Sequence, residues 1–342
     1  MERLDELKEI LKKPRRIVIT MHQKPDGDAL GSALGLHNYL IKKGHDSTVV
    51  TPTDYPQFLK WMPGNDSVVD YEKDPEKSVK TVEAAEIIFC LDFNKLNRLG
   101  GLFESVEASD AKIVMIDHHL DPDDYDDFRM SVPTASSTAE LIYDLILLFG
   151  DESFIDLDIA ECLYSGIMTD TGSFRFNSTT PKVHMIAAEL LKKGVDLNKV
   201  HGNIMDTFSE ARMRFFGYCI KEKLTILPEY RMAYIAVSAE EIRKYYLKTG
   251  DTEGLVNYPL SLDNVKFAAL IIDRTLPGSK ETLIKLSLRS TGSFSVYEIT
   301  HKYFNGGGHK NAAGGISSLS LEDTLKKLLD LLPQYKEQLN TD

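Results

Sequence analysis

The chain has 342 residues, so we expect more than one domain, because a single hydrophobic core rarely serves a chain of this length. Its composition is that of an ordinary globular protein, which excludes a fibrous or low-complexity protein. The formal net charge of −12 argues against a general coat for nucleic acid and against a membrane-surface protein.

Cysteine usage and hydropathy indicate a cytoplasmic protein. The cysteines, Cys90, Cys162 and Cys219, stand far apart in apolar sequence, as is expected of buried thiols in a reducing compartment. No apolar run approaches the ~20 residues that span a bilayer, and residues 1–10 predict a charged amphipathic helix instead of a signal peptide. We therefore expect no membrane partner.

The first half of the chain predicts strands that alternate with helices. Such alternation is typical of βαβ units, so we predict an α/β domain with a mainly parallel sheet flanked by helices. The strands are expected at 17–19, 46–50, 86–91 and 112–116. The helices are expected directly after the first strand and at 138–148, 157–168 and 181–194.

The second half predicts a smaller α/β domain. A helix expected at 208–224 connects it to the first, so we assign residues 1–195 to the first domain, 196–224 to a connector and 225–342 to the second domain. An active cleft is expected between the two domains. The second domain's strands are expected at 231–237, 265–272 and 282–290, and its helices at 239–247, 295–303 and 321–332.

Metal-binding residue types directly follow the first predicted strand. His22, Asp26 and Asp28 stand close together, Pro25 and Gly27 bend the chain between them, and Asp28 is placed where a helix N-cap is expected. The alternative interpretation is an ordinary turn whose second Asp only caps a helix. This segment alone leaves the two interpretations even.

The same pattern recurs where later elements end, which favours a metal site. Asp92 ends one strand, Asp117, His118 and His119 end the next, and Asp170 ends a helix. Because the carboxyl ends of parallel strands meet at one edge of a sheet, these side chains are expected to converge. Carboxylate with imidazole and no thiol favours Mn²⁺, or Mg²⁺, over structural zinc, and so many carboxylates call for two divalent cations. Two such ions suit hydrolysis at phosphorus, with Asp92 as the bridging ligand.

A glycine-rich stretch in the second half is a candidate anion site. Gly306, Gly307 and Gly308 precede His309, and their backbone N–H groups can approach a phosphate closely, although a tight turn explains the glycines equally well. Alternation in the strand before it places Arg289 on a polar face, where the guanidinium is suited to bidentate phosphate binding.

These motifs resemble the DHH phosphoesterase superfamily. The resemblance is carried by Met21-His22-Gln23-Lys24-Pro25-Asp26-Gly27-Asp28-Ala29-Leu30-Gly31-Ser32, by Asp92, by Asp117-His118-His119 and by Asp170-Thr171-Gly172. The Gly-Gly-Gly-His stretch and Arg289 resemble the C-terminal domain that is associated with DHH proteins. The resemblance therefore covers nearly the whole chain and implies the same α/β fold.

The resemblance also implies roles for single residues. It implies a first metal on His22, Asp26 and Asp92, and a second on Asp28, Asp92, His118 and Asp170. His119 is expected to face the substrate phosphate and protonate the leaving group, with Asp117 orienting the imidazoles. Residues 306–309 and Arg289 are expected to bind the far end of the substrate. Arg175, just after a metal motif, is expected to reach phosphate as well.

The two-domain length most resembles the NrnA-like branch of the superfamily. This branch implies a cytoplasmic, two-metal phosphoesterase, with Mn²⁺ or Mg²⁺, that acts on short oligoribonucleotides, linear dinucleotides and 3′-phosphoadenosine 5′-phosphate. An inorganic pyrophosphatase or exopolyphosphatase is the alternative enzyme, and a non-catalytic nucleotide sensor on the same scaffold is the alternative of another class. The acidic charge disfavours long nucleic acid as a substrate. A homodimer stays an open alternative.

Overall fold

The computed structural model describes residues 3–248, 250–276, 278–279 and 281–341. The chain divides into two compact units, Met1–Thr207 and Phe208–Asp342, and the division falls within the connector predicted at 196–224. Each unit has a sheet and a hydrophobic core of its own, and the cleft expected between the domains stays a prediction. Among the described residues, no helix is both long and apolar enough to cross a membrane.

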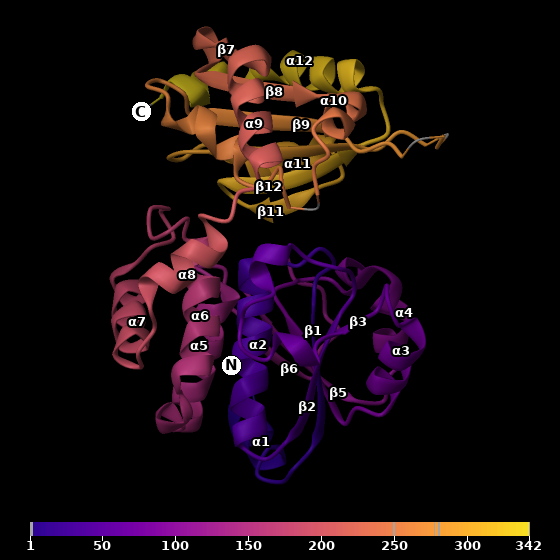
Figure 1. Cartoon of the computed structure of the whole chain (residues 1–342), viewed down its shortest axis with the longest axis vertical. Helices are drawn as coiled ribbons and strands as arrows, with labels where there is room; N and C mark the ends of the chain where they lie inside the picture. The colour runs from indigo at the N-terminus through magenta and orange to yellow at the C-terminus, as the bar shows by residue number, and fades with distance from the viewer. Residues whose placement is uncertain (1–2, 249, 277, 280, 342) are drawn as a thin grey trace. The chain divides into compact units, whose positions relative to one another are not determined.

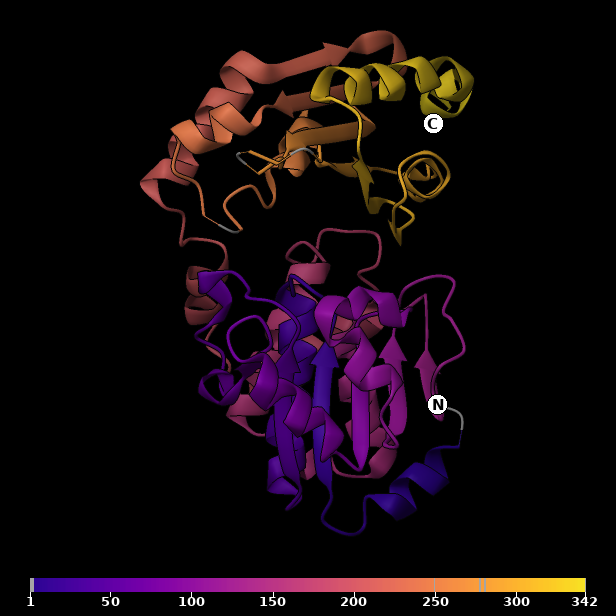
Figure 2. The same ribbon diagram turned by 90° about the vertical axis from the view of Figure 1, so that its right-hand side faces the viewer.

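The first unit is built on a parallel sheet, as predicted. Within the described residues it has six strands, and every neighbouring pair runs in the same direction (Figure 2). Their spatial order is β3 (Val69–Asp70), β2 (Asp46–Thr51), β1 (Arg16–Met21), β4 (Ile87–Leu91), β5 (Lys112–Asp117) and β6 (Phe128–Ser131). The edge strands β3 and β6 were not predicted, because each is too short to show a periodic pattern of apolar residues.

Helices cover both faces of this sheet (Figure 1). One face packs against α1 (Leu4–Ile10), α2 (Gly27–Lys42), α5 (Thr138–Phe149), α6 (Leu157–Asp170), α7 (Pro181–Lys192) and α8 (Leu197–Ile204). The other packs against α3 (Pro75–Glu83), the 3₁₀ helix η3 (Leu96–Leu102) and α4 (Phe103–Glu107). Along β1, Ile17 and Ile19 join the first core and Val18 joins the second, which is the alternation of a strand buried on both sides.

Glycines let α2 and α6 pack very closely. A Cβ built on Gly31 of α2 would lie 2.6 Å from the carbonyl oxygen of Cys162 in α6. A Cβ on Gly166 of α6 would lie 2.6 Å from Cβ of Ala139 and 3.0 Å from Oδ1 of Asp28. Side chains at these positions would push the helices apart, so the glycines fix where Asp28 stands.

The second unit is the smaller α/β domain that was predicted. Its sheet is antiparallel apart from the parallel pair β8/β9. The spatial order is β11 (Gly307–His309), β12 (Ala312–Ser317), β10 (Ile284–Ser290), β9 (Phe267–Asp273), β8 (Met232–Val237) and β7 (Leu224–Leu227). One face packs against α11 (Val296–Tyr303) and α12 (Leu321–Asn340), the other against α9 (Glu210–Tyr218), α10 (Ala239–Lys244) and the 3₁₀ helix η7 (Leu255–Ser261).

The predicted cap of α2 was wrong. Asp26 and not Asp28 caps α2, because Oδ1 of Asp26 accepts hydrogen bonds from the backbone N–H groups of Asp28 and Ala29, both at 3.0 Å. The helix expected at 208–224 is present as α9, and a π-helix at Cys219–Lys223 continues it. The glycine-rich stretch supplies β11 and the start of its hairpin with β12.

Candidate metal centre

The first group of candidate ligands lies at the carboxyl ends of two adjacent central strands. Ligand atoms of His22, Asp26 and Asp92 lie within 4.8 Å of one another. Nε2 of His22 is 3.4 Å from Oδ2 of Asp92 and 4.0 Å from Oδ2 of Asp26. Nδ1 of His22 lies 2.9 Å from the carbonyl oxygen of Gln23, which can only accept. Nδ1 therefore carries the proton and the lone pair of Nε2 faces the carboxylates.

The second group gathers around His118. Its Nε2 is 3.3 Å from Oδ2 of Asp170, 3.4 Å from Oδ1 of Asp92 and 3.7 Å from Oδ2 of Asp28. Nδ1 of His118 lies 3.2 Å from the carbonyl oxygen of Ala135, so this ring too turns its free nitrogen toward the carboxylates. The structure thus brings together the four residues that the sequence predicted for a second ion.

Asp92 belongs to both groups, and its two carboxylate oxygens divide between them. Oδ2 faces His22 and Oδ1 faces His118. The backbone of Asp92 is left-handed, with φ of 63°, and its N–H donates to the carbonyl oxygen of Ile116 at 3.1 Å. Such a conformation costs ~1 kcal/mol or more and is typically held by its surroundings at functional sites. This carboxylate is therefore placed to bridge two ions.

Asp28 is anchored by the N-terminus of α5. Its Oδ2 accepts a hydrogen bond from the backbone N–H of Thr138 at 2.6 Å, and its Oδ1 accepts one from Ala139 at 2.9 Å. The hydroxyl of Thr138 also donates to Oδ1 of Asp92 at 3.0 Å. Sequence reasoning missed Thr138, although a Ser-Thr pair at a helix start was a signal for a polar role. Each carboxylate oxygen keeps a second lone pair for a cation.

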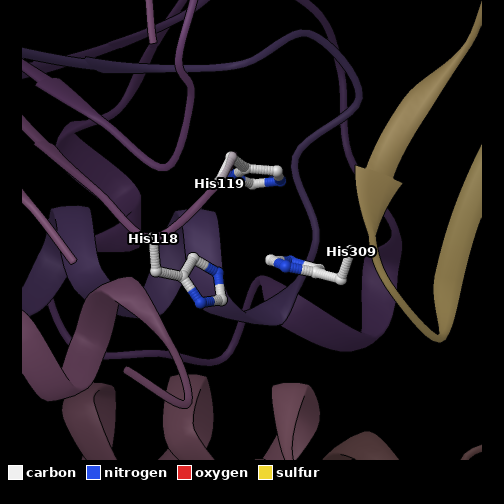
Figure 3. Close-up of side chains that lie close together, drawn as sticks. All are labelled: His118, His119 and His309. Carbon is white, nitrogen blue, oxygen red and sulfur yellow. The ribbon is translucent and has the colours of Figure 1, made fainter. Parts of the chain in front are cut away.

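His119 and Asp117 form a separate pair beside these groups. Nδ1 of His119 donates to Oδ1 of Asp117 at 2.7 Å, which leaves Nε2 of His119 without a proton when the ring is neutral. The rings of His118 and His119 lie 5.2 Å apart with their planes at 76° (Figure 3). Oδ2 of Asp117 is buried and has no hydrogen-bond partner among the described residues. The orienting role of Asp117 stays a prediction.

The electrostatics of the centre call for positive charge. Burial, and then the charges of Asp92 and Asp170, raise the pKa of Asp28 well above its ordinary value. Burial also opposes the charge on Asp92, but His118 and His22 can each donate a hydrogen bond from Nε2 when the ring is protonated, and this holds the pKa of Asp92 well below the usual range. Divalent cations between these carboxylates would remove the repulsion. The donor set of carboxylates and imidazoles, with their far sides held by backbone groups, therefore fits metal ions.

The predicted substrate-binding residues of the second unit lie around β10 and the β11–β12 hairpin. Arg289 is half-buried on the polar face of β10. A Cβ on Gly306 would lie 2.0 Å from the carbonyl oxygen of Gly314, and one on Gly308, which has φ of +131°, would lie 2.6 Å from that of Ala312. The hairpin therefore explains two of the three glycines, while a Cβ on Gly307 would meet nothing within 4 Å.

Arg175 stands apart from the ligand groups of the first unit. It is exposed, and its Nε donates to the carbonyl oxygen of Gly172 at 2.9 Å. Gly172 lies in the turn that follows Asp170, so the arginine is bonded to a turn beside a candidate ligand. Its predicted contact with phosphate stays a prediction.

Known protein families match most of the chain. The model of the DHH family N-terminal domain matches residues 16–167, and that of the DHHA1 domain matches residues 231–338. The chain is 32% identical over 321 residues to the probable bifunctional oligoribonuclease and PAP phosphatase NrnA of Streptococcus mutans, covering 92% of this chain and 94% of that protein. It is 29% identical to the bifunctional oligoribonuclease and PAP phosphatase NrnA of Thermus thermophilus, covering 92% of this chain and 88% of that protein.

A solved structure shares the whole fold. The crystal structure of an exopolyphosphatase-related protein from Bacteroides fragilis superposes with a TM-score of 0.91 and is 38% identical, covering 99% of this chain and 97% of that one.

Proposed function

Because the chain belongs to the DHH family and carries a DHHA1 domain, we propose that it is a metal-dependent phosphoesterase that hydrolyses short oligoribonucleotides, linear dinucleotides and 3′-phosphoadenosine 5′-phosphate. The observation that carries the proposal is the division of the Asp92 carboxylate between two ligand groups. The relatives whose names state these two activities match the chain over nearly its whole length.

The two ligand groups support a proposed place for each of two ions. His22, Asp26 and Asp92 would hold the first, and the second would be held by Asp28, Asp92, His118 and Asp170. When bound, two divalent cations lower the pKa of water and offset charge on phosphate oxygens. Mn²⁺ is the ion we propose, with Mg²⁺ as the alternative, because oxygen and imidazole donors suit both.

His119 would supply the proton that the leaving oxygen needs. The 2.7 Å hydrogen bond from Nδ1 of His119 to Asp117 leaves Nε2 to face the substrate, and the buried carboxylate of Asp117 would stabilise the ring when it is protonated. A protonated His119 then presents an N–H at Nε2. Loss of either residue should slow turnover and leave the two ligand groups in place.

The second unit would bind the part of the substrate that is not cleaved. Arg289 offers a guanidinium that can donate two hydrogen bonds to a phosphate, and His309 offers a further donor. Gly307 leaves space beside its backbone, because a Cβ there would meet nothing within 4 Å. Arg175 is proposed as a further phosphate contact of the first unit. We also propose that residues 1–195 and 225–342 act as catalytic and substrate-binding domains joined by 196–224, in a cytoplasmic protein.

A substrate panel tests the proposal. The purified protein is stripped of metal and then given Mn²⁺ or Mg²⁺. It is incubated separately with a dinucleotide, with 3′-phosphoadenosine 5′-phosphate, with pyrophosphate and with an RNA of ~24 nucleotides, which is longer than a short-strand binding site. Mononucleotides from the dinucleotide and inorganic phosphate from 3′-phosphoadenosine 5′-phosphate are expected. Hydrolysis of pyrophosphate alone would replace the proposal by the pyrophosphatase alternative. Tight nucleotide binding without turnover would replace it by a sensor.

A further inference from the structure

The two ligand groups, as the described residues form them, contain carboxylates and imidazoles and no arginine. Ions bound there are therefore largely neutralised by their own ligands. A phosphate also presents oxygens that contact neither the ions nor the leaving group. Proteins usually bind such oxygens with arginine, whose guanidinium donates two parallel hydrogen bonds.

Arg98 is placed to supply that group. It lies in η3, just after β4 and Asp92, and its carbonyl oxygen accepts a hydrogen bond from the backbone N–H of Gln23 at 2.8 Å. The backbone of Arg98 is thus fastened to the residue that follows His22. Gly100 leaves room for the Gln23 side chain here, because a Cβ built on Gly100 would lie only 3.2 Å from Oε1 of Gln23.

The guanidinium of Arg98 has no ion pair in the part of the chain that the structure describes. The side chain is half-buried, and its guanidinium nitrogens form no hydrogen bond or salt bridge with the described residues. Its neighbour Lys95 differs, because Nζ of Lys95 lies 3.1 Å from Oδ1 of Asp123. An arginine kept beside a metal centre without a carboxylate partner is available to an anion.

We propose that Arg98 binds the phosphate that is cleaved, as a substrate-binding residue of the first unit. The inference rests on the proposed function and names a further residue for it. Since the contact is to the scissile phosphate, every substrate should depend on Arg98 to a similar degree.

The test compares the wild type with Arg98→Ala, Arg98→Lys and the matched control Lys95→Ala, all loaded with Mn²⁺. Their kcat/KM is measured on one dinucleotide with and without a 5′-phosphate, their inhibition by inorganic phosphate is titrated, and their Mn²⁺ affinity is read from thermal shifts. For Arg98→Ala we expect kcat/KM to fall about 10- to 100-fold on both substrates, since a hydrogen bond to a charged group is lost. Inhibition by phosphate should weaken with it, Mn²⁺ affinity should be unchanged, and Arg98→Lys should recover part of the loss.

Several outcomes would overturn the proposal. One is an Arg98→Ala enzyme as active as Lys95→Ala. Another is a loss confined to the 5′-phosphorylated dinucleotide, which would place Arg98 on a different phosphate. A third is a parallel loss of Mn²⁺ affinity, which would show that Arg98 only holds the loop of His22. If the wild type cleaves neither dinucleotide, the proposed function fails, and phosphate binding to the Mn²⁺-loaded variants still decides the role of Arg98.

Discussion

Asp92 is the residue on which the candidate metal centre depends most. It is nearly fully buried, its backbone is left-handed, and its carboxylate faces His22 on one side and His118 on the other. A residue in that position must supply two oxygens and tolerate positive φ. Aspartate and asparagine meet the second condition better than other non-glycine residues, and only aspartate meets both.

We therefore predict that Asp92→Asn folds but loses activity by about 10³-fold or more, because an amide supplies one acceptor where a carboxylate supplies two. Activity at saturating Mn²⁺, bound metal per chain and thermal unfolding are the measurements. Asp124→Asn, a change at a 95% exposed carboxylate, is the control and should behave as the wild type. An Asp92→Asn protein with full metal content and near-normal turnover would refute the bridging role.

The role proposed for Asp117 is to act on the chemistry through His119. Asp117→Asn should lower kcat about 10- to 100-fold, because the amide no longer fixes the protonated nitrogen of the ring or stabilises its charge. Mn²⁺ affinity should stay unchanged, since neither residue belongs to the two proposed ion positions. Steady-state kinetics with a Mn²⁺ titration separates the two quantities. Loss of metal in step with kcat would instead make Asp117 a ligand, as its unpartnered Oδ2 and closeness to Asp92 would then allow.

For single residues, the sequence predicted which ionisable side chains would come together, but it did not predict the backbone groups that orient them. Residue types at strand ends were enough to bring His22, Asp92 and His118 together, because parallel strands share an edge. The carbonyl oxygens of Gln23 and Ala135, which orient the imidazoles, leave no mark on residue type. Any residue can supply a carbonyl, so these partners emerge only from the fold.

The helix pair α2/α6 sets the distance between ligands of the second group. Asp28 lies in the first turn of α2 and Asp170 at the end of α6, and glycines allow the two helices to touch. Gly166 is the glycine whose substitution should affect the ligands most directly, because a Cβ there would meet both Ala139 and the carboxylate of Asp28.

Gly166→Ala should therefore destabilise the protein by about 1–3 kcal/mol and weaken Mn²⁺ binding, since an extra methyl in a packed interface forces the helices apart. Gly202→Ala is the matched control, because it is also a helical glycine and its Cβ would meet nothing within 4 Å. That variant should gain up to about 1 kcal/mol from helix propensity and bind Mn²⁺ normally. Chemical denaturation and metal titration measure both. Equal behaviour of the two variants would contradict the packing argument.

Elements were predictable where periodicity was strong and where local rules were not overridden. The helix expected to end at Leu332, before Pro333, runs on to Asn340. Proline removes one hydrogen bond, but Tyr335 and Leu339 are buried in the hydrophobic core of the second unit, and this burial outweighs the loss. Tertiary packing of this kind is not visible in a local pattern.

The whole molecule divides its charge as well as its fold. Acidic residues predominate in the first unit, whose ligand groups around Asp92 place several carboxylates in a buried space, and the second unit is nearly neutral. Without cations, burial and then the charges of Asp92 and Asp170 raise the pKa of Asp28.

Metal should therefore stabilise one unit more than the other. Adding Mn²⁺ to the stripped protein at about 100 times its Kd should stabilise the first unit by about 2.7 kcal/mol per ion, since the ion binds only the folded form. Hydrogen exchange read by peptide should slow around His22–Asp28, Asp92, His118 and the start of α5, while β8, β9 and β10 keep their rates. Chelation should reverse the effect and abolish turnover. A rise in stability confined to the second unit, or turnover that survives thorough chelation, would show that the carboxylates of the first unit are held together without metal.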